Sequence, residues 1–156
     1  MKSKTQKVLR EITSQIQALK SMDEIYERVV QILSELEHFT WTGIYLLEED
    51  ELVLKCYRGE ETQHKRIKIG EGICGYAAKF KKSVVVPDVS KDSRYLSCFP
   101  QTKSEIVVPI VGKEVYGEID VDSDILDAFG EEDRILLEEI ASELSQKIER
   151  KNLKGC

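Results

Sequence analysis

The chain has 156 residues, of which 41% are hydrophobic and 33% charged, a balance that fits one globular domain spanning 1–156 and excludes a disordered chain. Its formal net charge of −6 argues against nucleic acid as a partner, because a nucleic-acid groove needs a basic surface. No stretch approaches the roughly 20 consecutive apolar residues that span a bilayer, and no signal-peptide core follows the basic start. We therefore expect a cytoplasmic protein with reduced thiols and no membrane partner.

Two amphipathic helices are predicted within residues 1–37. Residues 4–20 place apolar side chains at helical spacing. Ser21 and Glu24 are then spaced as in a capping box, in which the serine starts a helix and the glutamate reaches back to its backbone. This second helix is expected to end near Leu36.

Residues 39–123 predict a sheet, because aromatic and β-branched residues dominate short segments that polar turns separate. A short helix at 73–80 and a long loop at 87–101 interrupt the strands, and a final helix occupies 131–151. Hairpins join most consecutive strands, so the expected fold is α+β, with a mainly antiparallel six-stranded sheet and the N- and C-terminal helices packed together. The predicted strands are 39–47, 52–57, 66–69, 83–86, 105–111 and 115–122.

The last predicted strand carries an unusual number of carboxylates. Because side chains alternate between the two faces of a strand, Tyr116, Glu118, Asp120 and Asp122 are expected on one face. Acids on one face repel each other, which leaves two interpretations. The face is solvated near the strand end, or it forms a site for a cationic ligand or for a carboxyl group with a raised pKa. Glu105 opens the neighbouring strand and is either an edge charge or a further member of this group.

Cys74 and Cys98 are the thiols best placed for chemistry. Cys74 begins the short helix, and a helix N-terminus stabilises a thiolate. Cys98 lies in the long loop, where a cysteine is more exposed than in a core. The alternative for each of these cysteines is that it packs against its neighbours and takes no part in chemistry. Cys56 is expected to be a small buried hydrophobe on the same face as Leu52 and Leu54.

The sequence indicates no metal and no organic cofactor. The cysteines, which include the terminal Cys156, form no CxxC pair and no zinc-type spacing, and His38 and His64 are the only histidines. Trp41 and Tyr45 lie four apart in a predicted strand and so share a face. They either pack in the core or form an aromatic wall against the apolar end of a small ligand.

Taken together, these residues resemble one family. Cys98 follows Cys74 by 24 positions, and Glu105 follows Cys98 by seven. With this spacing, the span 39–144 resembles the GAF domain, and within that family it resembles the free methionine-(R)-sulfoxide reductases. The segments that carry the resemblance are Thr40-Trp41-Thr42-Gly43-Ile44-Tyr45, Gly72-Ile73-Cys74-Gly75, Ser104-Glu105-Ile106-Val107 and Ile119-Asp120-Val121-Asp122-Ser123.

The resemblance implies a redox role for two cysteines. Cys98 would be the nucleophile, whose thiolate attacks the sulfoxide sulfur and becomes a sulfenic acid. Cys74 would then form a disulfide with Cys98, and a thioredoxin-like dithiol would restore both thiols. His64 stands where many members have a third cysteine, so the chain would belong to a two-cysteine subtype.

The resemblance also implies how the substrate, free methionine sulfoxide, is held. Glu105, Asp120 and Asp122 would hold its ammonium group and assist protonation of the sulfoxide oxygen, while Trp41 and Tyr45 would surround its methyl and thioether end. The short helix and the long loop would lie over this site. The resemblance implies that the protein is a homodimer, and it implies no cofactor.

Two features keep an alternative open. Phe99 replaces the acidic residue that usually follows the nucleophile, which changes the expected pocket. The loop segment from Asp88 to Leu96 also resembles that of sensory GAF domains, which bind small molecules or dimerise without using a cysteine. The alternative function is therefore a non-catalytic ligand-binding or signalling domain.

Overall fold

The computed structural model describes residues 2–97 and 99–154, and its centre is an antiparallel sheet. Six strands lie in the order β3-β2-β1-β6-β5-β4, and every neighbouring pair is antiparallel. The predicted α+β fold with a six-stranded sheet is confirmed. The strands are β1 (Trp41–Glu48), β2 (Glu51–Arg58), β3 (Arg66–Lys68), β4 (Val84–Val86), β5 (Ser104–Val111) and β6 (Val115–Ser123).

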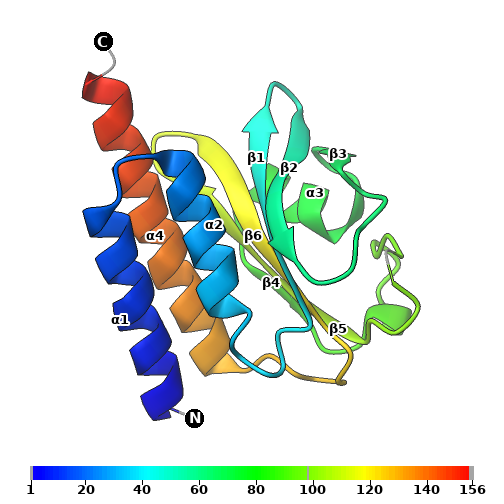
Figure 1. Ribbon diagram of the computed structural model, residues 1–156. Coiled ribbons are helices and arrows are strands. Elements are labelled where there is room, and N and C mark those ends of the chain that lie inside the picture. Colours follow the sequence, from blue (N-terminus) through cyan, green and yellow to red (C-terminus); the bar gives the residue numbers. More distant parts are fainter. Residues whose placement is uncertain (1, 98, 155–156) are drawn as a thin grey trace.

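Three helices lie on one side of the sheet (Figure 1). They are α1 (Lys2–Ala18), α2 (Met22–Leu33) and α4 (Glu131–Lys154). Two of them, α2 and α4, contact the strands, and α1 packs on these two, so the N- and C-terminal helices pack together as predicted. Their apolar side chains and those of the sheet form one buried core. Among the helices of the described residues, none is long and apolar enough to cross a membrane.

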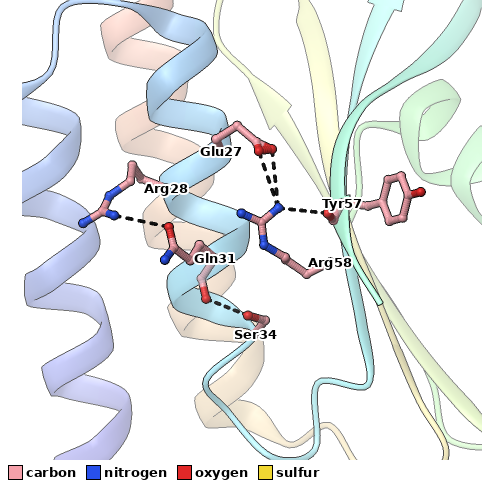
Figure 2. A network of polar contacts seen from close by, with 6 residues as sticks. All are labelled: Glu27, Arg28, Gln31, Ser34, Tyr57 and Arg58. Carbon is pink, nitrogen blue, oxygen red and sulfur yellow. Dashed lines mark hydrogen bonds and ion pairs between the residues drawn. The ribbon is translucent and has the colours of Figure 1, made fainter. Parts of the chain in front are cut away.

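The start of α2 follows the prediction, since the Ser21 side chain accepts a hydrogen bond of 3.4 Å from the Glu24 backbone N–H. Its end does not, because α2 stops at Leu33 rather than near residue 36. Figure 2 shows polar contacts around this helix, including Arg58 of β2, which lies 3.5 Å from Glu27. These groups are exposed, so such pairs contribute at most about 1 kcal/mol. The buried apolar side of α2 therefore holds it on the sheet.

The opposite face of the sheet carries α3 (Gly72–Phe80) and the long connection from β4 to β5 (Figure 1). This connection includes one short 3-10 turn, η1 (Val89–Lys91), which the sequence did not predict. A second apolar cluster fills the space between the sheet and these segments. The expected short helix and long loop over one side of the sheet are thus confirmed.

Two irregularities in the sheet correct the predicted faces. In β2, Ile44 pairs with Cys56 and Tyr45 with Leu54, so Lys55 is an extra residue that reverses the alternation. Cys56 is buried as predicted, but it lies in the helix-side core and not on the face of Leu52.

The second irregularity lies between β5 and β6 and turns Tyr116 away from the acidic face. Val111 pairs with Val115 and Ile110 with Gly117, which makes Tyr116 the extra residue. Tyr116 packs against the helix-side core, and its hydroxyl donates a 2.7 Å hydrogen bond to Glu149 of α4. The prediction that Tyr116 shares a face with Glu118 is therefore wrong, because strict alternation does not extend through a bulge.

Candidate active site

Four carboxyl groups meet on the sheet face under α3 and form what we call the acid cluster: Glu105, Glu118, Asp120 and Asp122. Glu105 of β5 pairs directly with Asp122 of β6. Their exposed fractions are 5% for Glu105, 0% for Glu118, 5% for Asp120 and 3% for Asp122. The interpretation of a solvated acidic face is therefore wrong, because the loop and α3 cover this part of the sheet.

The acid cluster has no compensating cation within residues 2–97 and 99–154. None of the ion pairs formed by the described lysines, arginines and histidines involves it. Oδ1 of Asp120, Oδ1 of Asp122 and both carboxyl oxygens of Glu118 are buried without a hydrogen-bond partner in this part of the chain. A buried charge without a partner costs several kcal/mol. The cluster therefore either holds protons or binds a cationic group.

Burial raises the pKa of every carboxyl group in the cluster. It is the main cause for Glu118, whose pKa lies well above its usual range. The pKa of Glu105 is raised well above its usual range by burial and then by the charges of Asp120 and Asp122. For Asp120 burial raises the pKa, although hydrogen bonding to Glu105 opposes the shift. Carboxyl groups that keep protons near neutral pH can act as general acids.

Cys74 lies beside the acid cluster, in the first turn of α3. Its sulfur and one oxygen each of Glu105 and Asp120 all lie within 4.8 Å of one another. Burial, and then the charges of Asp120 and Glu118, raise the pKa of the Cys74 thiol well above its ordinary value. The expectation of a thiolate stabilised by the helix N-terminus is therefore wrong in this arrangement, because burial and neighbouring carboxylates outweigh the helix dipole.

A small cavity opens at this cluster, with a volume of about 20 Å³. That volume holds about one water molecule. The arrangement is thus closed, with room for a water or an ion but not for an amino acid. Its lining consists of Tyr45, His64, Ile67, Ile73, Cys74, Leu96, Glu105 and Asp120.

The loop segment just before Cys98 is fixed over α3 by three contacts. The Arg94 guanidinium lies 4.4 Å from the centre of the Tyr76 ring. Leu96 packs on Gly72, where φ is +65° and an added Cβ would lie 2.7 Å from a Leu96 methyl group. His64 Nε2 lies 3.2 Å from the Ser97 carbonyl oxygen. Cys98 and Cys156 themselves lie outside the described residues.

Of the two predicted aromatic residues, Tyr45 reaches the cavity and Trp41 does not line it. The Tyr45 hydroxyl donates a 2.7 Å hydrogen bond to the His64 carbonyl oxygen. The Trp41 ring stacks on Tyr57 with centroids 5.9 Å apart and lies 6.0 Å from Phe99. Phe99 is therefore a packing residue of the apolar cluster.

The predicted site lacked five residues of the cavity lining and the acid cluster, which are His64, Ile67, Ile73, Leu96 and Glu118. Glu118 could have been included, because it lies two positions before Asp120 on the same strand face. His64 and Leu96 could not, because only the folding of the two connections over α3 brings them to the cavity.

The comparison with known families agrees with this architecture. A profile described as GAF domain matches residues 20–149. The chain belongs to the GAF domain family. The matched residues include the whole central sheet together with α2, α3 and most of α4.

Several GAF relatives carry informative names. GAF domain-containing protein A of Dictyostelium discoideum is 40% identical over 114 residues, which cover 72% of each chain. The free methionine-R-sulfoxide reductase of Saccharomyces cerevisiae is 38% identical over 106 residues, or 65% of this chain and 58% of that protein. The free methionine-R-sulfoxide reductase of Neisseria meningitidis, solved with its substrate, matches with a TM-score of 0.91 and 31% identity over 96% of this chain and 91% of that one.

Proposed function

We propose that this GAF protein is a thiol-dependent oxidoreductase that reduces free L-methionine (R)-sulfoxide to methionine. The observation that carries the proposal is the acid cluster, which is buried beside Cys74 and has no cationic partner among the described side chains. A free amino acid supplies the missing cation through its ammonium group. The names of the relatives at 31% and 38% identity support the same activity.

In the proposed reaction Cys98 is the nucleophile. Its thiol takes the oxygen of the sulfoxide, so that the S–O bond breaks, methionine leaves and Cys98 becomes a sulfenic acid. The Cys74 thiol then attacks that sulfur, which forms a disulfide and releases water. A thioredoxin-like dithiol reduces the disulfide and is itself oxidised, which restores both thiols.

The acid cluster has two tasks in this proposal. Asp120 and Asp122, in the ionised form, bind the ammonium group of the substrate. A protonated carboxyl group, for which Glu105 is suited because its pKa is raised by burial and by its two acidic neighbours, donates to the sulfoxide oxygen as the S–O bond breaks. Coupled groups of this kind share protons, so the cluster titrates as a unit.

The apolar part of the proposed site surrounds the methyl and thioether end of the substrate. Tyr45 contributes from the cavity wall. Trp41 packs beside that wall on the same face of the sheet, since its ring covers Gly43, the residue that pairs with Asp120 across the strands. Because the closed cavity holds only about one water, Leu96 and the loop on which it lies move aside when the substrate enters.

The proposal extends to the setting of the enzyme. We infer a homodimer, a cytoplasmic location that keeps the thiols reduced, and a thioredoxin-like protein as the reductant. The proposed function involves neither nucleic acid nor a membrane as a partner. In this proposal the electrons pass between thiols of the enzyme and of the reductant, and no metal or organic cofactor takes part.

Blocking the amino group of the substrate tests the role of the acid cluster. N-acetyl-methionine (R)-sulfoxide lacks the ammonium charge, so buried carboxylates are left unpaired when it binds. Hydrogen bonds to charged groups contribute about 1.5–3 kcal/mol each, so kcat/KM should fall at least about 100-fold. The measurement is a steady-state assay of both compounds with one dithiol reductant.

The methyl ester of the same sulfoxide is the matched control for that assay. It keeps the ammonium group and removes the carboxylate charge, so its turnover should exceed that of the acetylated compound. Equal turnover of free and acetylated substrates would contradict the role given to the acid cluster. Tight binding of the free sulfoxide without any turnover would instead favour the alternative, a GAF ligand-binding domain.

A further inference from the structure

We propose that Cys74, Glu105 and Asp120 form a binding site for a zinc-class divalent cation. Each residue comes from a different element: α3 supplies the sulfur, and β5 and β6 supply the carboxylates. The sulfur and the two oxygens lie within 4.8 Å of one another. In zinc sites the metal–sulfur bond is about 2.3 Å and the metal–oxygen bond about 2.0–2.2 Å. Small movements of these three side chains would bring their ligand atoms to the separations that such bonds require.

Asp120, which lines the cavity, carries a buried oxygen, Oδ1, without a hydrogen-bond partner among the described residues. Both carboxyl oxygens of Glu118, on the same strand face, are also buried without such a partner. An ion held by Cys74 and Asp120 would satisfy the Asp120 oxygen directly.

The size and lining of the cavity favour an ion over a larger ligand in the closed arrangement. Its volume of about 20 Å³ suits one water-sized occupant. The remaining walls are largely apolar, with Ile67, Ile73 and Leu96 among them. An apolar shell strengthens the attraction between a cation and its ligands by excluding water.

The donor set indicates which metal fits. One thiolate with two carboxylates suits Zn²⁺, whose catalytic sites use three protein ligands and leave a fourth position open. Mg²⁺ prefers oxygen ligands in an octahedral shell and retains several waters, so this site disfavours it. The ligands are far apart in the sequence, which is why no local cysteine and histidine spacing indicates the site.

Zinc bound here would occupy Asp120, which helps to hold the substrate ammonium group in the proposed reaction, and Glu105, which donates the proton. It would also keep the Cys74 sulfur from attacking Cys98. If the proposed function holds, zinc and methionine sulfoxide compete for one site. The metal site itself does not depend on that activity.

The test is calorimetric titration of the reduced, chelator-treated full chain with ZnCl₂. We expect one bound Zn²⁺ per chain, an affinity at least about 100-fold weaker in Cys74→Ser and in Asp120→Asn, and no comparable binding of Mg²⁺. In known sites, mutating residues that only support the metal ligands lowers metal affinity about 10- to 100-fold, so removing a ligand itself should lower the affinity more. Cys56→Ala is the matched control, because it removes a buried thiol on the other side of the sheet and should bind zinc like the wild type.

Cobalt gives a second readout that does not depend on turnover. Bound Co²⁺ should show thiolate-to-metal charge-transfer absorption that Cys74→Ser lacks and Cys98→Ser retains. Absence of stoichiometric zinc binding, or unchanged binding in folded Cys74→Ser, would overturn the proposal. Zinc binding by a protein that fails to reduce the sulfoxide would refute the proposed function and leave the metal site standing.

Discussion

Replacing Cys98 by serine is expected to lower turnover of free methionine (R)-sulfoxide at least about 10³-fold, since a serine hydroxyl cannot accept the oxygen as a thiol does. Without any reductant, the wild type should release about one methionine per chain and stop with Cys74 and Cys98 oxidised. Cys98→Ser should release none. Cys74→Ser should also release about one and accumulate a form of Cys98 that has gained one oxygen, because no second thiol attacks the sulfenic acid.

Single-turnover assays with mass spectrometry of the intact protein measure these stoichiometries. Cys56→Ala is the control, and it should behave as the wild type because Cys56 lies in the helix-side core. Burial raises the pKa of Cys56 to about 12, which leaves it unreactive near neutral pH. Full activity of Cys98→Ser, or equal stoichiometry in all variants, would remove Cys98 from the role of nucleophile.

Replacing Glu118 by glutamine is expected to stabilise the metal-free protein at alkaline pH. Glu118 is fully buried, and burial raises the pKa of its carboxyl group well above the usual range. Ionisation of a buried glutamate destabilises the folded protein. Glutamine has nearly the same volume and does not ionise, so it avoids this cost. The new amide donors can reach acceptors at Asp120 and Cys74, which lie beside this carboxyl group.

The sign of the pH dependence follows from proton linkage. The folded pKa exceeds the unfolded value of about 4.3, so between these two values the folded state binds more protons. Stability therefore falls as pH rises from about 4 through the folded pKa of Glu118, by about 1.4 kcal/mol for each unit of difference. Glu118→Gln should remove this contribution.

Denaturant titrations across this pH range, with chelator present, provide the measurement. The variant should be more stable than the wild type at alkaline pH, and the difference should shrink as the pH approaches 4. Glu114→Gln, at an exposed position in the turn before β6, is the matched control and should follow the wild type. A variant that is less stable than the wild type at alkaline pH would show that the Glu118 carboxylate is compensated in the folded protein.

The order of the elements could be predicted from the sequence because most segments are locally consistent. Residues 4–20 and 131–151 have the spacing of amphipathic helices, and hairpins separated by polar turns account for the antiparallel sheet. The extra residues Lys55 and Tyr116 could not be predicted, because a bulge is set by how two strands pair and not by either strand alone. These two residues reversed the expected faces of Cys56 and Tyr116.

The acid cluster was predicted only in part, because its position follows from the strands whereas its burial depends on a segment far away in the sequence. Alternation placed the acids of β6 on one face, and strand pairing brings Glu105 beside Asp122. Their burial could not be read from the pattern, since it depends on the loop over α3. The same loop reversed the expected pKa shift of Cys74, because burial among carboxyl groups raises it while a helix N-terminus alone lowers it. The single domain over 1–156 and the role of Cys98 remain predictions.

The central claim is best tested by incubating the reduced wild-type protein with the two epimers of free methionine sulfoxide and a dithiol reductant, and by following methionine release. We expect the (R) epimer to be consumed over many turnovers and the (S) epimer to be left. If the folded protein consumed neither epimer with any of several dithiols, the reductase would be contradicted. The acid cluster would then belong to a GAF domain that binds a cationic ligand without changing it.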